Sequence, residues 1–265
     1  MAPLAPIYRE LEKCPVSIEY LKPLAKYDEE KPYLLALDIP VADESDRTNL
    51  DFGEVRLEAA NARSVQEKIS IESHSFELFT LPPGLMARYF GRLGRVPEME
   101  GVHNLLADRF KAEKVIVYDH AHRVEEDRSE EAKYTFSNRP THSIIVRNPH
   151  ADQSTTSGRK RVETFLTLDE QERYCNDKWR IRIINFWKPI YHRIQRAPLL
   201  LCDPLSVSSA DILLCDVVSQ QYVGEVLFLK YSPTHRWFWF KGQEENEALL
   251  FVSYDSHGPG NGVGK

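Results

Sequence analysis

The sequence predicts a mainly β fold with flanking helices, of the jelly-roll or cupin-like type. Short strand candidates recur at fairly regular intervals in the C-terminal half. Turn residues separate them, among them Asn148-Pro149, Lys188-Pro189 and Lys241-Gly242. Most of the helical composition precedes them. Short strands bounded by Gly, Pro and Asn are typical of sandwiches and barrels, with the helices packed outside.

The strand candidates share short runs of β-branched and aromatic residues. They cover residues 114–118, 143–146, 180–187, 198–202, 223–231, 236–240 and 248–254, with one or two more between 69 and 81. Helical composition is found over 54–70, over most of 85–110, and near 168–179 and 208–211.

Length and proline content predict one domain with an N-terminal extension. Prolines interrupt residues 1–50 repeatedly, at positions 3, 6, 15, 23, 32 and 40, so we expect this segment to wrap over the domain. A jelly-roll domain with helical insertions is expected over 51–256. A Gly-rich tail follows over 257–265.

Composition excludes several classes of protein. A net charge of −6 and a pI near 5.9 argue against a nucleic-acid binder. The four cysteines lack the paired spacing of zinc sites and indicate free thiols in a reducing compartment. No signal-peptide pattern and no apolar run of about 18 residues is present, so we expect a cytoplasmic protein that does not span a membrane.

His150-Ala-Asp152 is the first candidate site. Residues i and i+2 of an extended segment point to the same face, so the imidazole and the carboxylate would converge. Nitrogen and oxygen ligands of this kind suit Fe(II). A loop in which Asp152 caps a turn explains the same spacing.

Polar residues also interrupt an apolar strand candidate at Arg182 and Asn185. Burying either without a partner would be costly, so each should face a partner or a polar cavity. The alternative places Arg182 on a solvated face and leaves Asn185 to bond neighbouring backbone.

Two further clusters deserve the same comparison. Alternation puts Trp237 and Trp239 on the face opposite Phe238 and Phe240, so one face packs in the core and the other could line an apolar ligand cavity. His235 precedes this strand. Asp119, His120 and His122 could bind a metal, but we favour a strand that ends in a charged turn.

Six ordered motifs together resemble the fungal AsaB-type hydroxylase/desaturase family, which is similar to gibberellin desaturase-like proteins. They lie at Tyr118–Arg123, His150–Ser154, Ile184–Ile190, Pro198–Asp203, Tyr231–Trp237 and Tyr254–Ser256, and the resemblance covers about 51–256. It implies a double-stranded β-helix, Fe(II)/2-oxoglutarate chemistry in secondary metabolism, and His150 and Asp152 as the first two iron ligands.

The resemblance also implies a departure from the family. Family members continue with a Pro-His-x-Ala-Phe stretch and an Arg-x-Ser-Ile-Glu segment, taken to supply the distal histidine and the 2-oxoglutarate arginine. Neither is present after Ser256, where His257 is the one histidine. We therefore expect a jelly roll without its last strands, and a homodimer or the N-terminal segment covering the exposed sheet edges.

These features favour a non-oxidative cyclase or isomerase that uses no cofactor. It would form a ring, of the Diels–Alder type, in a terpenoid or polyketide precursor by holding the reactive geometry. Its pocket would contain catalytic His150, Asp152, Arg182 and His235, with Asn185, Trp187, Trp237 and Trp239 binding the substrate.

Two alternatives remain open. In an Fe(II)/2-oxoglutarate hydroxylase or desaturase, His257 would join His150 and Asp152 on the metal, and Arg182 would bind the co-substrate carboxylate. In a non-catalytic binding protein the pocket would persist without turnover. In every case the expected partner is a hydrophobic small molecule.

Overall fold

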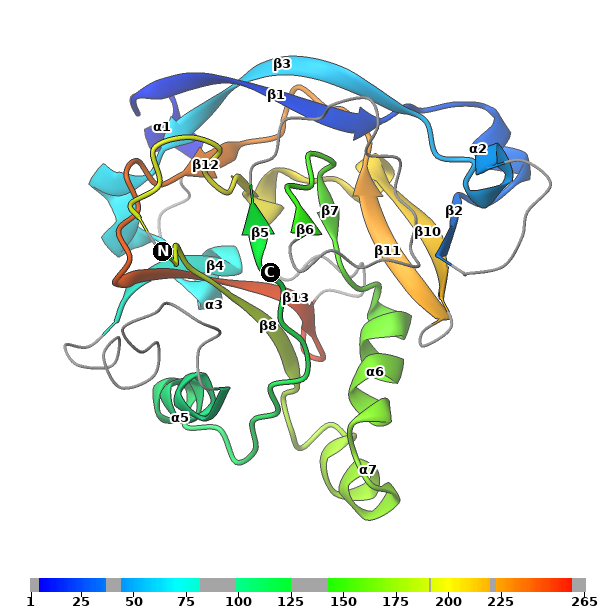
Figure 1. Cartoon of the computed structure of the whole chain (residues 1–265), viewed down its shortest axis with the longest axis vertical. Coiled ribbons are helices and arrows are strands. Elements are labelled where there is room, and N and C mark those ends of the chain that lie inside the picture. The colour runs from blue at the N-terminus through cyan, green and yellow to red at the C-terminus, as the bar shows by residue number, and fades with distance from the viewer. Residues whose placement is uncertain are drawn as a thin grey trace.

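The computed structural model describes residues 5–36, 44–81, 99–124, 143–190, 192–219 and 223–258. Within these residues the strands form two four-stranded sheets, a three-stranded sheet and a two-stranded pair. Helices α5, α6 and α7 lie at the periphery (Figure 1). The mainly β fold with flanking helices is thereby confirmed.

The first sheet crosses the top of the molecule in Figure 1 and has the order β1-β3-β12-β9. Its strands are β1 (Lys13–Leu21), β3 (Phe52–Asn61), β12 (Trp237–Trp239) and β9 (Leu201–Cys202). Strand β3 replaces the helix expected over 54–70. Its charged residues 54, 56 and 58 are exposed and alternate with more buried apolar ones, a period of two that the helical composition concealed.

The second sheet has the order β2-β10-β11-β7. It contains β2 (Tyr33–Ala36), β10 (Ile212–Ser219), β11 (Val223–Leu229) and β7 (His150–Ala151). The proline-rich N-terminal segment therefore supplies β1 and β2 to two sheets. The boundaries of that segment, of the 51–256 domain and of the tail stay predictions.

The third sheet joins β4 (Phe76–Thr80), β13 (Glu247–Asp255) and β8 (Arg182–Trp187), all antiparallel. The pairing of β13 with β8 shifts register between Val252 and Tyr254, which leaves Ser253 as the extra residue of a bulge. The two-stranded pair is β5 (Arg123–Val124) with β6 (Ser143–Ile144).

Among the described residues, three α-helices have only four residues each, and α5, α6 and α7 have 12, 10 and 7. They are α1 (Ala5–Tyr8), α2 (Lys26–Glu29), α3 (Ile71–His74), α5 (Met99–Phe110), α6 (Thr155–Thr164) and α7 (Leu168–Tyr174). The 3-10 turns are η1 (Glu44–Arg47), η2 (Arg63–Lys68), η3 (Pro204–Ser206) and η4 (Ser209–Asp211).

Helix α6 was not expected, and the strand expected over 114–118 is irregular chain. No helix in the described ranges has both the length and the apolar character needed to cross a bilayer.

The core divides into three clusters. One lies between the first and third sheets around Phe76, Phe238 and Leu249. A second gathers Ile18 and Trp237 with residues of β3 and β11. The third packs α3 and α5 against the outer face of the third sheet. The opposite placement of Trp237 and Phe238 confirms the alternation expected of β12.

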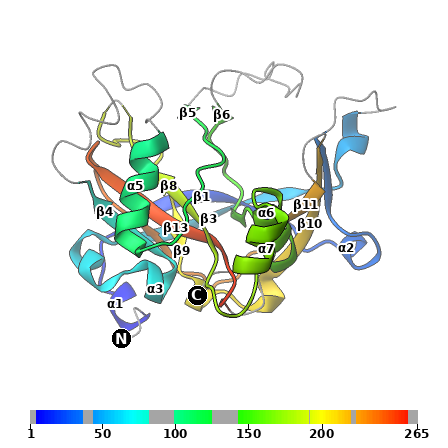
Figure 2. The ribbon, with the colours of Figure 1, turned by 90° about the horizontal axis from the view of Figure 1, so that it is seen from below.

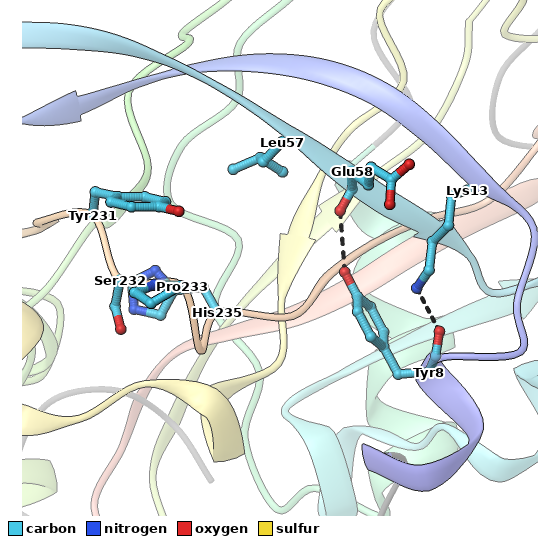
Figure 3. Close-up of a pocket in the computed structure, with 8 residues that line it drawn as sticks. All are labelled: Tyr8, Lys13, Leu57, Glu58, Tyr231, Ser232, Pro233 and His235. Carbon is cyan, nitrogen blue, oxygen red and sulfur yellow. Dashed lines mark hydrogen bonds between the residues drawn. The ribbon is translucent and has the colours of Figure 1, made fainter.

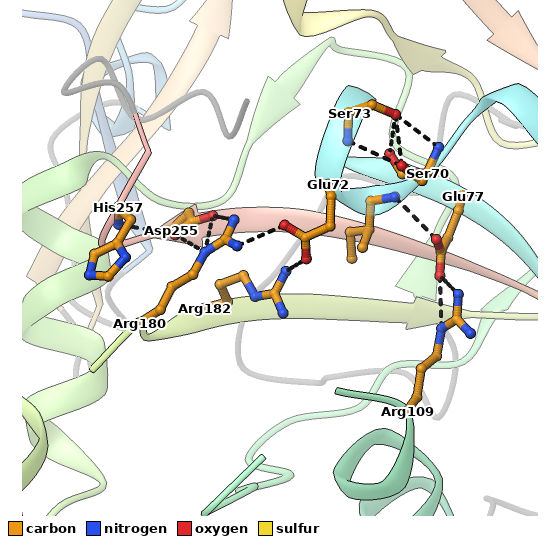
Figure 4. A network of polar contacts seen from close by, with 10 residues as sticks. Ser70, Glu72, Ser73, Glu77, Arg109, Arg180, Arg182, Asp255 and His257 are labelled. Carbon is orange, nitrogen blue, oxygen red and sulfur yellow. Dashed lines mark hydrogen bonds and ion pairs between the residues drawn. The ribbon is translucent and has the colours of Figure 1, made fainter. Parts of the chain in front are cut away.

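An ion-pair network connects α3 to β8 and β13 on the outer face of the third sheet (Figure 4). Arg180 lies between Glu72 of α3, at 2.7 Å, and Asp255 at the end of β13, at 2.5 Å. Arg182 contacts the second oxygen of Glu72. Because the Asp255 side chain is 3% exposed, its pairing with Arg180 fixes the end of β13.

Candidate metal site

The His-x-Asp pair lies where the second sheet approaches the third. His150 sits on the two-residue strand β7 and pairs with Phe228 of β11. Asp152 is the first residue after β7, and α6 begins three residues later at Thr155, with Ser154 as its N-cap. Figure 2 shows α6 beside β11, with β13 and β8 next to it.

Hydrogen bonds attach this loop to β11. The Ser154 amide and the Ser157 hydroxyl both donate to the carbonyl oxygen of Glu225, at 3.1 and 2.7 Å. The Ser154 hydroxyl also donates to the Glu225 carboxylate at 2.6 Å. Ser154 and Ser157 form a capping box as well, so the start of α6 is fixed two residues beyond Asp152.

Helix α6 also packs against β13 at unusually short range. A methyl group built on Gly158 would lie 2.3 Å from Cδ2 and 2.5 Å from Cγ of Tyr254. Only a residue without Cβ lets the helix approach the strand this closely. The loop that carries Asp152 is thus held from both sides.

The side chains of His150 and Asp152 face each other, each with a hydrogen-bond acceptor atom turned toward the other. His150 Nδ1 lies 2.7 Å from the Asn148 carbonyl oxygen, which accepts only, so Nδ1 carries the proton. In the neutral ring Nε2 then presents a lone pair, and it lies 3.4 Å from Asp152 Oδ1. Two acceptors at this distance require a proton or a metal ion between them.

The other oxygen of Asp152 is fully engaged. Asn185 Nδ2 donates to Asp152 Oδ2 at 2.9 Å, and the Ser253 hydroxyl donates to the same atom at 3.2 Å. Burial raises the pKa of the Asp152 carboxyl, but His150, Asn185 and Ser253 outweigh it and hold that pKa below its ordinary value.

The pKa of His150 moves the other way. Burial lowers it, whereas the Asp152 carboxylate and the Asn148 carbonyl outweigh burial and raise it overall. The negative charge of Asp152 therefore favours a cation beside it, which a proton on His150 or a bound metal ion can supply.

This donor set fits a divalent transition metal. Two ligand atoms at right angles around an ion with bonds near 2.1 Å lie about 3 Å apart, close to the separation of Nε2 and Oδ1. The His150 ring is oriented by a backbone carbonyl, as metal-binding imidazoles usually are. The side chains are 29% and 46% exposed, so the site is open to small molecules.

A third ligand is not assigned. Within the described ranges, no group of three His, Cys, Asp or Glu side chains could hold a metal ion. His257 is exposed, and its amide donates to Asp255 Oδ1 at 3.0 Å beside Arg180 (Figure 4). Its expected role on the metal stays a prediction.

The other predicted site residues lie apart from this pair, except Asn185. Arg182 contacts Glu72 and lies over the Phe110 ring, 4.7 Å from its centroid. Trp187 packs against the first core cluster, and Trp237 and Trp239 belong to the second. Their proposed contacts with substrate stay predictions.

His235 borders a pocket of about 190 Å³ (Figure 3). Its Nε2 lies 3.3 Å from Asp211 Oδ2 and its Nδ1 3.3 Å from the Tyr20 hydroxyl. Trp237 Nε1 donates to that hydroxyl at 2.8 Å. None of the lining residues belongs to the His150–Asp152 pair.

Sequence reasoning missed two contributors. Ser253 gave no signal because it sits inside an apolar strand, and its role depends on the pairing of β13 with β8, which places it on the face of Asn185. The Asn148 carbonyl cannot be recognised from a side-chain pattern. Asp119, His120 and His122 form no metal-binding group of three in the described chain.

Comparison with known proteins identifies the family. The model of a family described as an oxidoreductase/YMDC permease-like domain (YDMC) matches residues 18–264. The chain belongs to this family. Hydroxylase/desaturase CTB9 of Cercospora beticola is 27% identical over 214 residues, 74% of this chain and 64% of the relative. This chain thus spans less than two thirds of that relative's length.

Two further matches bear on the fold and on the cofactor. Alpha-ketoglutarate-dependent dioxygenase tstK of Talaromyces stipitatus is 25% identical over 78% of this chain and 73% of its own length. The solved structure of the iron and alpha-ketoglutarate-dependent endoperoxidase NvfI superposes with a TM-score of 0.73 at 17% identity, covering 95% of this chain and 87% of that one.

These matches confirm the hydroxylase/desaturase resemblance and the jelly-roll fold of this YDMC-family member. The expectation of no cofactor is wrong, because similar proteins are named for dependence on iron and alpha-ketoglutarate. The oxidative alternative therefore has better support than the cyclase, because the relatives named above are a hydroxylase/desaturase and a dioxygenase. The prediction of a cyclase gave more weight to the missing C-terminal motifs than to the retained His-x-Asp pair.

Proposed function

We propose that this protein is an Fe(II)/2-oxoglutarate-dependent oxygenase, a hydroxylase or desaturase of a hydrophobic fungal secondary metabolite. The observation that carries the proposal is the pair of acceptors, His150 Nε2 and Asp152 Oδ1, facing each other 3.4 Å apart on an open surface. Family membership and the names of the relatives support the same chemistry.

His150 and Asp152 would hold the metal, and each has a distinct task. The Asn148 carbonyl keeps the proton of His150 on Nδ1, which leaves Nε2 free to bind. Asp152 contributes the negative charge that offsets a divalent ion. Bound iron with 2-oxoglutarate supplies the oxidation of a C–H bond by dioxygen. With His150 and Asp152 as protein ligands, further coordination positions of the metal stay open for the co-substrate and oxygen.

An aromatic surface beside the pair supports an apolar substrate. The ring centroid of Phe228 lies 6.2 Å from that of His150, and Phe52 packs edge-on against Phe228 at 5.3 Å. Both phenylalanines are partly exposed. A hydrophobic molecule resting on Phe228 would bring its C–H bonds next to the metal.

Anaerobic titration tests the proposal. Fe(II) followed by 2-oxoglutarate should give the metal-to-ligand charge-transfer absorption of a chelated oxo acid in wild-type protein. His150→Ala and Asp152→Ala should lose it, whereas His120→Ala, on an exposed turn, should keep it. Wild-type protein that binds neither iron nor 2-oxoglutarate would refute the proposal. The expected homodimer stays a prediction.

A further inference from the structure

We propose that Asn185 and Ser253 are positioning residues that hold Asp152 with a single carboxylate oxygen turned toward the metal. The inference rests on the function proposed above and concerns how its site is built. Neither side chain would touch the metal or the substrate. Each acts through Asp152.

The hydrogen atoms of this cluster can be assigned completely. Asn185 Nδ2 has two protons, one for Asp152 Oδ2 and one for the Ser253 hydroxyl oxygen, both at 2.9 Å. The Ser253 proton then goes to Asp152 Oδ2 at 3.2 Å. A carboxylate only accepts, which fixes the orientation of the Asn185 amide. Every donor is used once.

The consequence is an asymmetric carboxylate. Oδ2 accepts two hydrogen bonds, and Oδ1 faces His150. Rotation of the carboxylate would break both bonds from the third sheet, so Oδ1 is the oxygen presented to a cation. Hydrogen bonds to a ligand carboxylate are the kind of outer contact that tunes metal affinity.

Strand alternation places Ser253 at this position. Leu249, Phe251 and Ser253 alternate to one face of β13, and Phe251 pairs with Asn185, so Ser253 lies on the face from which Asn185 bonds Asp152. Val252 pairs with Ile184 and Tyr254 with Ile183, so Ser253 is the residue of β13 that is left unpaired by a bulge. Its hydroxyl donates to Asp152 Oδ2 at 3.2 Å.

Contacts on both sides keep the bulge in place. The Val252 amide donates to the Ser75 carbonyl at 2.8 Å. Tyr254 is buried beneath Gly158 of α6, and Asp255 is paired with Arg180. Ser253 itself is 3% exposed. Its hydroxyl therefore has little freedom to leave Asp152.

The test uses the full chain and Mn(II), which prefers the same nitrogen and oxygen ligands and stays divalent in air. Free Mn(II) is measured by electron paramagnetic resonance during titration. Ser253→Ala removes one bond to Asp152, and we expect about tenfold weaker binding. Asn185→Ala removes the other bond and frees the Ser253 hydroxyl, and we expect a 10- to 100-fold loss.

Two readouts separate positioning from general loss of structure. The circular dichroism spectrum and the urea midpoint of each variant report folding. A crystal structure of each metal-free variant should show the Asp152 carboxylate turned away from its wild-type position. Asn104→Ala, at an exposed position of α5, and Ser232→Ala, at a partly exposed loop position, serve as matched controls and should bind Mn(II) like wild type.

The outcomes are distinguishable. Wild-type protein that fails to bind Mn(II) refutes the proposed function and this inference together. Wild-type binding with equal affinity in folded Asn185→Ala and Ser253→Ala variants refutes the inference alone. If Asn185→Ala does not fold, Ser253→Ala decides, because removing one hydroxyl leaves the strand pairing of β13 intact.

Discussion

Replacing Gly158 with alanine should destabilise the protein, although alanine is the better helix former. Inside a helix the exchange alone would stabilise by roughly 1 kcal/mol. Here the new methyl group would meet Tyr254 Cδ2 at 2.3 Å, Cγ at 2.5 Å and Cβ at 2.9 Å. Overpacking of this kind costs about 1–3 kcal/mol, and such short contacts favour the upper end. We expect a net loss of about 2 kcal/mol.

A double-mutant cycle in urea checks this reasoning. Tyr254→Ala removes the two closest contacts, so Gly158→Ala should be nearly neutral in that background, a coupling of about 2 kcal/mol. Gly53→Ala is the control, since its methyl group meets only the flexible Lys22 side chain, no closer than 3.3 Å. It should cost nothing measurable. An equal loss in both Tyr254 backgrounds would show that the close helix–strand contact does not explain the glycine.

Three further predictions concern charge. Asp255→Asn should lower the free energy of unfolding by about 3 kcal/mol in urea titrations, whereas Glu72→Gln should lower it by less than about 1 kcal/mol. The reason is that the Asp255 side chain is 3% exposed and the Glu72 side chain 52% exposed. Equal losses would contradict this. Asp203→Asn should cost about 3 kcal/mol by the same measurement, since this fully buried carboxylate pairs with Arg236 at 2.8 Å. Burial lowers the pKa of His235 from 6.5, so the folded state disfavours its charged form and stability falls as pH drops below about 6.5. His235→Gln should remove that part of the pH dependence, so the wild-type free energy of unfolding minus that of the variant should be larger at pH 7.5 than at pH 5.5.

Strands with clear alternation were predictable from sequence. The segments expected over 180–187 and 248–254 are β8 and β13, where β-branched and aromatic residues set a period of two. Strand β10 was missed because its run follows a turn that looked helical. In β3 the glutamates, arginine and alanines suit a helix, and pairing with β1 overrides that propensity.

The site was only half predictable. The His150–Asp152 spacing indicated convergence, and both side chains do converge. Asn185 was expected to bind the substrate, and its side chain bonds Asp152. Arg182 lies on the other face of the same strand, because side chains three positions apart in a strand point to opposite faces. Helix α6 was missed because its capping box uses Ser157 at the third position, where Glu or Gln is the usual signal.

The contacts around Asp152 join parts of the chain that are 33 and 101 residues apart. Closing such long loops costs entropy before any contact is gained, so this cluster should be complete only when the fold is complete. An ion that binds the finished cluster and not the open chain stabilises the native state by mass action, about 2.7 kcal/mol at a hundredfold excess over its dissociation constant. Metal supply would then govern how long the folded protein survives proteolysis, even in the absence of any substrate.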